Sequence, residues 1–389
     1  MRLRLVILAL GTFAMGVDTF VIAPILGPMG SDLGVSRGTA GQLVTAYALA
    51  YAIAGPLLAA AFGHRRPRAV LLGALVVFAL GNALTAVASS YPIAALSRVV
   101  AGAGASMYTA NALALARRLV PGAGQGRAVA TVVGGLTTAI VFGVPIGAWL
   151  GATTGWRLTL WLVAAFTVVA ATGIAAAIPD LDGRPGAGVR ARLAPLRDRH
   201  VLAIVAATAL CLASSWTAYN YIGQVLRPAT GGDAGRASLA LLFFGAGAVV
   251  GNLLAGRLAD RDGPAQTIAM AAPGLTVAVT AAAVLGTTTA SALALVLVWG
   301  VLHWMINVPQ QLRVTAAAPD AAPLVLGLHQ TAIYVGIAIG GVAGAAGLAV
   351  AGRPGIGYAA SVVGVVALAV LALSFRLDPS RARAAVTPC

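Results

Sequence analysis

The sequence contains no lysine and no glutamate, and charged residues make up only 9% of its 389 positions. Soluble domains carry roughly 25% charged residues, so a water-soluble fold is excluded. Without lysine the chain cannot form the glycine-rich phosphate loop that ends in Lys, which excludes ATP-driven pumping by this chain alone. Its two cysteines, Cys211 and Cys389, have neither a disulfide pattern nor a metal-ligand spacing. Nucleophile-elbow, His-Glu and paired-carboxylate motifs are missing as well, so we expect no enzyme and no cofactor.

Apolar residues are abundant instead, at 60% of the chain, with a mean hydropathy of +0.93. About 20 apolar residues cross a hydrocarbon layer of roughly 30 Å. Lipid offers no hydrogen-bond partners, so each such run must be a helix. Twelve runs have this length: 5–27, 40–62, 69–88, 92–116, 128–151, 158–178, 201–225, 237–257, 265–286, 290–312, 321–349 and 355–375. The sequence therefore predicts an all-α membrane protein with twelve transmembrane helices.

Arginine is distributed unequally between the two ends of these helices. If the N-terminus is cytoplasmic, nineteen of the 25 arginines lie on the cytoplasmic side and Arg98 lies inside a helix. The five on the opposite side are Arg37, Arg157, Arg227, Arg236 and Arg353. Positive charge in short loops marks the cytoplasmic side, so we expect both termini there. The net charge of +15 then reflects topology and attraction to anionic lipid, and we expect no nucleic-acid binding.

A polar stretch over residues 180–200 divides the chain, with two prolines and five arginines, a composition typical of a linker. We predict an N-terminal six-helix half over 1–179, a cytoplasmic linker over 180–200, a C-terminal six-helix half over 201–376 and a cytoplasmic tail over 377–389. An offset of about 195 residues aligns residues 55–59 with 251–255, each before a charged turn. Parallel repeats of this kind place a substrate site near the bilayer midplane, between the halves.

Several segments resemble the motifs of one family, the major facilitator superfamily. The turn 256–263 (GRLADRDG) is similar to the family's signature loop, and residues 98–104 (RVVAGAG) resemble its second motif. Residues 143–147 (GVPIG) followed by 155–157 (GWR) resemble the antiporter motif of the proton-linked efflux branch. The first helix and its exit, 16–24 and 32–36, resemble the same branch. The motifs occur in the family's order along the whole chain.

The resemblance implies a fold that alternates between inward- and outward-open states and exports a small organic solute, drug-like, natural-product-like or sugar-like, in exchange for protons. It implies gating roles for the motif residues, which are Gly102, Gly143, Pro145, Gly147, Gly151, Gly256, Asp260, Arg261 and Gly263. The first-half loop departs from the family, because Gly63 stands where an aspartate is usual. A charged latch between helices is therefore missing at that loop.

Gly143, Gly147 and Gly151 recur at every fourth position, with Pro145 between the first two. Small residues at this spacing let another helix approach closely, and a proline loosens the backbone hydrogen bonding between them. We expect the close contact at the interface between the two halves. Packing alone and a hinge or leak-preventing role both remain open.

Asp18 is the only acidic residue inside the predicted helices. An ionisable group in the membrane costs at least roughly 2.5–3.5 kcal/mol, so by default it is functional and has a partner. We expect that partner to be Arg98, since at ~1.5 Å per residue the two lie about 14 Å and about 9 Å from the outer ends of their helices. We interpret the two as a proton-coupling pair. A fixed structural pair and direct binding of a cationic substrate by Asp18 are the alternatives.

Polar and aromatic side chains recur at helical spacing on several predicted helices, where they would form a mostly apolar pocket with a few orienting hydrogen bonds. The candidate substrate-binding residues are Tyr47, Tyr51, Trp216, Asn220, Gln224, His303, Asn307, Gln311, Gln330 and Tyr334. We expect those on the seventh helix to share one face, and likewise those on the tenth. Such a pocket suits a neutral or weakly polar organic molecule. Interhelical hydrogen bonding or interfacial anchoring is the alternative for each residue.

Composition, topology and resemblance together predict a secondary active transporter of the inner (cytoplasmic) membrane, with protons, a small organic substrate and the lipid bilayer as its partners. We expect it to act as a monomer. An importer or uniporter of the same fold is one alternative. A non-transporting membrane sensor or a membrane-embedded hydrolase is the alternative from another class.

Overall fold

The computed structural model describes residues 2–120, 124–182 and 188–378, and within them the chain forms helices and no strands. Parts of the predicted linker (183–187) and tail (379–389) lie outside the described residues. The helices are α1 (Arg2–Asp32), α2 (Arg37–Phe62), α3 (Pro67–Val87), α4 (Tyr91–Leu119), α5 (Gln125–Thr138), the π-helical turn η2 (Ala139–Gly143), α6 (Val144–Thr153), α7 (Trp156–Ala177), α8 (Val189–Leu193), the 3-10 turn η3 (Ala194–Arg197), α9 (Arg199–Tyr219), α10 (Ile222–Thr230), α11 (Ala234–Asp262), α12 (Pro264–Leu285), α13 (Thr289–Trp304), α14 (Asn307–Ala317), the 3-10 turn η4 (Pro319–Ala321) and α15 (Ala322–Arg376).

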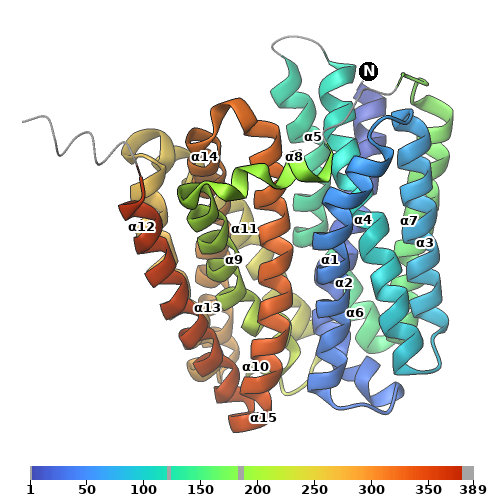
Figure 1. The fold of residues 1–389 in the computed structure, drawn as a ribbon. Helices are drawn as coiled ribbons and strands as arrows, with labels where there is room; N and C mark the ends of the chain where they lie inside the picture. Colours follow the sequence, from blue (N-terminus) through green and yellow to red (C-terminus); the bar gives the residue numbers. More distant parts are fainter. Residues whose placement is uncertain (1, 121–123, 183–187, 379–389) are drawn as a thin grey trace, which may run out of the picture.

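Eleven helical segments of the described chain are long and apolar enough to cross a membrane. The last of them contains two crossings, because α15 has 55 residues, about 82 Å of helix against a hydrocarbon core of roughly 30 Å. It breaks at Ala351 and Gly352, where Gly352 adopts a φ of 61° that glycine tolerates without strain. The chain then turns back, so the backbones at Gly347 and Gly355 come into contact (Figure 1). The fold thus has the twelve crossings that the sequence predicts.

The fifth crossing is interrupted in its middle by the π-helical turn η2. Pro145 has no N–H to donate to the carbonyl four residues earlier, so the regular ladder cannot continue through it. The N–H of Val144 donates instead to the carbonyl of Ala139, five residues back. The loosening that the sequence predicts around Pro145 therefore takes the form of a wider helical turn.

Two further crossings break where the sequence predicts continuous helices. α13 ends at Trp304 and α14 begins at Asn307, because Pro309 cannot donate to the carbonyl of Met305. α9 ends at Tyr219 and α10 begins at Ile222. Trp216 and Asn220 still lie one turn apart, since the Asn220 N–H donates to the Trp216 carbonyl, and so do Asn307 and Gln311 on α14. The breaks separate Gln224 from the first pair and His303 from the second, so neither set forms one continuous polar face.

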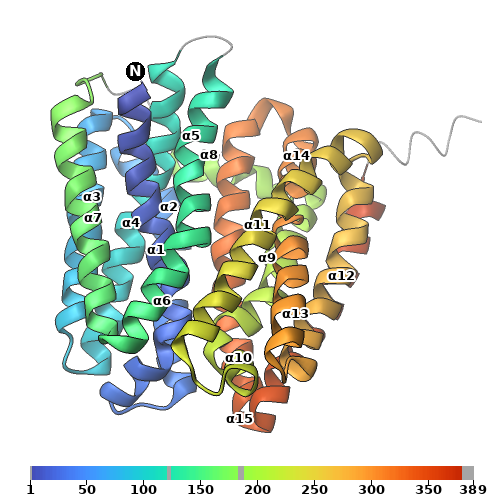
Figure 2. The same cartoon turned by 180° about the vertical axis from the view of Figure 1, so that it is seen from behind.

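Helices α1 to α7 lie together on one side of the molecule and α9 to α15 on the other (Figures 1 and 2). The short helix α8 crosses between the two groups at the end that also carries the N-terminus and the end of α15 (Figure 1). We call this the terminal end and the opposite one the far end. The start of α1, the end of α15 and α8 therefore lie at the same end of the molecule.

The two groups of helices contact each other through the middle and the far end. Near the far end the Arg37 guanidinium donates to the Gln224 side-chain oxygen at 2.5 Å, and the Gln42 amide donates to the Gly341 carbonyl at 3.3 Å. Deeper in the membrane, Gly245 of α11 lies directly against the backbone of η2. Hydrogen bonds thus join the two groups at the far end of this structure.

Candidate functional site

Asp18 and Arg98 form an ion pair in the interior of the first group of helices. The two guanidinium nitrogens donate to the two carboxylate oxygens at 2.7 and 3.1 Å, the fork-to-fork geometry that makes such pairs strong. The side chains are 0% and 1% exposed, respectively. Among the described residues Asp18 is the one fully buried acid. The partner that the sequence predicts for Asp18 is therefore the partner observed.

Side chains from two further helices surround this pair. The Tyr47 ring of α2 lies under the guanidinium, with 4.4 Å between the Arg98 Cζ and the ring centre, and the Asn82 side-chain oxygen of α3 accepts at 3.5 Å. The Tyr47 hydroxyl lies 3.2 Å from the Thr19 hydroxyl of α1. Four helices therefore meet at one charged centre.

The glycine Gly102, one turn after Arg98 on α4, makes this approach possible. A Cβ at this position would overlap the carbonyl of Tyr47, so only glycine lets α4 and α2 come this close. The same contact holds the Tyr47 ring against the guanidinium. Gly102 is thus a packing residue that positions the charged centre.

Aromatic rings continue from the charged centre into the second group of helices. The Tyr47 ring lies 6.4 Å, and the Tyr51 ring 3.4 Å, from the Tyr334 ring of α15 by their centres, and the latter two are nearly parallel at 13°. Gln330 lies one turn before Tyr334 and is partly buried. Tyr51 therefore stacks on Tyr334, and Tyr47 contacts both rings at an angle, so that the three tyrosines join the two groups of helices.

A second aromatic contact joins the groups at Phe20 of α1. Its ring centre lies 5.1 Å from that of Trp216, 5.6 Å from Tyr219 and 6.3 Å from Trp304. The Tyr219 hydroxyl donates to the Phe20 carbonyl at 3.4 Å. Phe20 therefore projects from the first group into a set of rings that belongs to the second.

The two histidines of the second group bond to different partners. His303 Nδ1 lies 2.7 Å from the Ser215 hydroxyl, which also accepts from the Trp299 indole at 2.7 Å. His329 Nε2 lies 2.9 Å from the Asn307 side-chain oxygen. The break at Met305 thus separates His303 and Asn307 into two hydrogen-bonded units.

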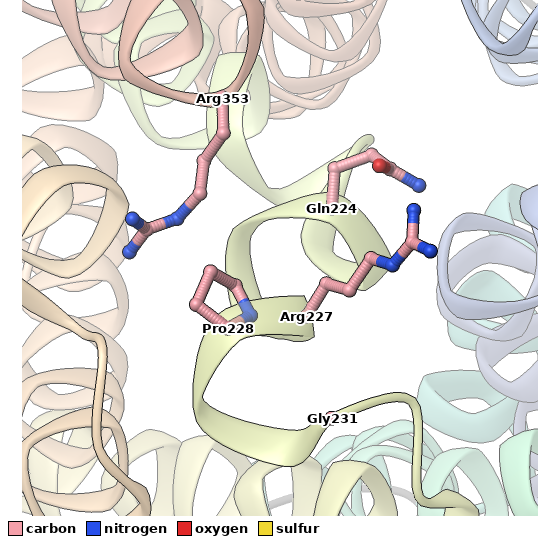
Figure 3. A pocket seen from close by; sticks show the side chains of 5 residues that line it. All are labelled: Gln224, Arg227, Pro228, Gly231 and Arg353. Carbon is pink, nitrogen blue, oxygen red and sulfur yellow. The ribbon is translucent and has the colours of Figure 1, made fainter.

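Three other candidates lie away from this centre or are bound within the helices. Gln224 lies at the far end, where it lines an open pocket of about 500 Å³ together with Arg227, Pro228, Gly231 and Arg353. Figure 3 shows the Arg227 guanidinium beside the Gln224 amide and that of Arg353 directed away from both. Asn220 donates to the Ile337 carbonyl at 3.0 Å, and Gln311 is partly buried on α14. Gln224 is therefore a far-end residue and not part of the central cluster.

Comparison with known proteins decides the family. The sequence model of the Major Facilitator Superfamily matches residues 8–341. The chain belongs to the Major Facilitator Superfamily. It is 37% identical to a chloramphenicol resistance protein of Streptomyces lividans over 87% of this chain and 88% of the relative. It is 31% identical to the inner membrane transport protein YdhP of Escherichia coli (strain K12), over 96% of each chain.

Solved structures agree with this fold. A bacterial homologue of the human lysosomal transporter Spinster, in an inward-facing and occupied conformation, superposes with a TM-score of 0.76 over 97% of both chains at 16% identity. The nucleoside transporter NupG superposes with a TM-score of 0.74, over 97% of this chain and 99% of that one, at 12% identity. The family match and the relatives identify the chain as a membrane transporter and not an enzyme.

The glycine stripe, which consists of Gly143, Gly147 and Gly151, packs against a helix of its own group. A Cβ on Gly147 would lie 2.8 Å from a Val21 methyl and 3.3 Å from that of Thr159, and Gly143 and Gly151 likewise face α1. The predicted location at the interface between the halves is therefore wrong. Small residues show that a helix comes close but not which helix it is.

The signature turn of the second half contains a single residue between helices. α11 continues through Gly256 and Asp260 to Asp262, and Gly263 alone connects it to α12 with a φ of 88°. Arg261 pairs with Asp262 at 3.3 Å on an exposed surface, and exposed pairs contribute only about 0–1 kcal/mol. In the first half, where the corresponding loop contains Gly63, an exposed pair at 2.5 Å joins Arg66 to Asp180, three residues after the end of α7.

The antiporter-like segments at the end of α1 and the start of α7 meet at the far end. Asp32, the last residue of α1, accepts from the Trp156 indole at 3.1 Å and pairs with Arg157. Arg157 also donates to the Ala88 carbonyl at 2.9 Å. Two segments that are 124 residues apart in the sequence therefore form one contact, which ties α1, α3 and α7 together.

Several important residues of the site were not predicted from the sequence. Phe20 is an apolar residue in an apolar helix, and nothing in its spacing marks it as a contact between the groups. Asn82 and Ser215 are the polar residues that bond the charged centre and His303. A search for every uncharged polar residue at mid-helix would have included both.

Proposed function

We propose that this transporter exports a small neutral organic solute in exchange for protons, and that Asp18 is the residue that carries the proton. The observation that supports the role of Asp18 is its burial in a two-hydrogen-bond pair with Arg98. Taking two ions out of water costs several kcal/mol each, so such a pair contributes little to net stability and is retained for another reason. A membrane-embedded acid that can be neutralised by a proton supplies that reason.

The position of the pair supports coupling to the substrate. Tyr47 contacts Arg98 on one side and Tyr334, in the opposite group of helices, on the other. A movement of the groups relative to each other must therefore change the surroundings of Arg98. Proton uptake and the alternation between inward- and outward-open states can be linked through this contact.

The chloramphenicol resistance relative supports export of a drug-like molecule. A chloramphenicol resistance protein is 37% identical to this chain, and export is one way in which a transporter confers resistance. We further propose that the chain lies in the cytoplasmic membrane as a monomer, with the terminal end in the cytoplasm, since that end carries most of the arginines. The hydrogen-bonded far end then faces the outside of the cell. We assign the two groups of helices to the halves 1–179 and 201–376, joined by the linker 180–200 and followed by the tail 377–389. The motif residues at the signature turn would act in gating.

Transport in proteoliposomes tests the role of Asp18. With an imposed pH gradient the wild-type protein should accumulate chloramphenicol, whereas Asp18→Asn should lose uphill accumulation and keep substrate binding and exchange, because only the titrating group is removed. Asp320→Asn, which changes an exposed aspartate of η4, is the matched control and should transport normally. Uphill transport by Asp18→Asn would contradict the proposal and direct attention to His303 or His329. Gradient-insensitive flux by the wild type would identify a uniporter.

A further inference from the structure

Trp216, Tyr219 and Trp304 form a set of rings around Phe20, which we call the aromatic cage. Trp216 and Tyr219 come from α9 and Trp304 ends α13, so the cage belongs entirely to the second group of helices. Phe20 comes from α1, and its ring lies nearly parallel to that of Trp304 at 25°. Trp216 and Trp304 both lie edge-to-face with His303 as well, at 6.0 and 5.7 Å. The cage is thus a preformed aromatic site that a side chain of the other group fills.

The indole N–H groups of this cage are the second observation. Trp216 and Trp304 are 2% and 8% exposed, and within the described part of the chain neither Nε1 atom has a hydrogen-bond acceptor. Two other buried tryptophans differ: the Trp299 indole donates to Ser215 at 2.7 Å and that of Trp156 to Asp32 at 3.1 Å. A buried donor without an acceptor is costly. The fold therefore satisfies its structural indoles and leaves unsatisfied the two that contact Phe20.

We propose that the aromatic cage binds the aromatic ring of a neutral substrate that carries hydrogen-bond acceptors, and that Phe20 occupies the same place when the substrate is absent. The ring of the substrate stacks where the Phe20 ring now lies, and its acceptors take the N–H groups of Trp216 and Trp304. This inference rests on the proposed transport function and specifies the substrate class of the central site. Nitroaromatic compounds and aryl amides have the required chemistry.

The same features disfavour a cation in the cage. Aromatic rings attract cations by their faces, but the two free N–H groups present positive hydrogen atoms and call for acceptors. The acid of this region, Asp18, is already paired with Arg98 through both carboxylate oxygens. A neutral acceptor-bearing ring therefore fits the site better than an organic cation does.

Equilibrium binding to the full chain in lipid nanodiscs tests the inference without any proton gradient, so its outcome is independent of the coupling role of Asp18. Chloramphenicol is the aromatic probe, arabinose the non-aromatic probe and tetraphenylphosphonium the cationic one. Trp216→Phe and Trp304→Phe keep an aromatic side chain and remove the N–H, so each should weaken chloramphenicol binding by about tenfold. Trp161→Phe, at an exposed tryptophan of α7, is the control and should leave binding unchanged.

Phe20→Ala distinguishes a side chain that competes with the substrate from one that contacts it. Removal of a competitor should tighten chloramphenicol binding several-fold, whereas removal of a contact would weaken it. Phe13→Ala, which removes the ring that packs on Phe166 within the first group, is the matched control. Three results would each overturn the inference. They are unchanged affinity in both tryptophan variants, weaker binding in Phe20→Ala, and tighter binding of arabinose or tetraphenylphosphonium than of chloramphenicol. Since each tryptophan is tested separately, a variant that fails to fold leaves the other to decide.

Discussion

Replacing Arg98 by alanine would leave the Asp18 carboxylate in the interior of the membrane protein without its positive partner. The loss in free energy of unfolding follows from the burial of the pair, because both side chains are at most 1% exposed and two direct hydrogen bonds join them. Breaking a buried pair by removing one partner costs about 3–5 kcal/mol, because an uncompensated charge remains. Arg98→Ala should therefore lower the free energy of unfolding by that amount, most of it due to the charge of Asp18.

A double variant separates the charge from the packing. In Asp18→Asn/Arg98→Met both charges are removed and the volume is largely kept, so most of the lost stability should return. Unfolding of the wild type and both variants in detergent, followed by tryptophan fluorescence, measures the two losses of stability. A loss below about 1 kcal/mol in Arg98→Ala, a value typical of an exposed pair, would refute the view that this is a buried, mutually dependent pair.

Two other predictions concern packing and topology. Gly147→Leu should lower the free energy of unfolding by about 1–3 kcal/mol and reduce transport, because the new side chain must displace Val21 of α1. Gly134→Leu faces open space and should be neutral in the same unfolding and transport assays. A single cysteine at Gly188, in a chain without its two native cysteines, should react with impermeant maleimide only in inside-out vesicles; labelling in intact cells would reverse the proposed orientation.

The charged centre and the number of crossings could be predicted from the sequence because charge is so scarce in this chain. One acid and one arginine inside twelve apolar runs have few other partners, and Asp18 and Arg98 indeed meet. Proline also gives a usable local signal, since Pro145 and Pro309 each lie just after an irregular turn. These features depend on chemistry that is local or nearly unique in the sequence.

The contacts of the glycine stripe and of Phe20 could not be predicted in the same way. A stripe of small residues on a membrane helix is compatible with any neighbour, and Gly147 packs on α1 rather than on the other group. Apolar side chains surround Phe20 along its own helix, so hydropathy carries no information about which one reaches across. The break after Tyr219 has no proline to mark it, and it moves Gln224 away from Trp216 to the far end.

The positions of Asp18 and Phe20 on α1 connect the two proposals. Residues two apart on a helix point in nearly opposite directions, since each residue turns the helix by about 100°. Asp18 accordingly contacts Arg98 of α4, while Phe20 contacts the aromatic cage of the second group. If a substrate displaces Phe20 by shifting or rotating this part of α1, the same movement would change the distance between the Asp18 carboxylate and the guanidinium. Helix α1 is therefore the element through which occupation of the cage by a substrate can reach the residue that we propose to carry the proton.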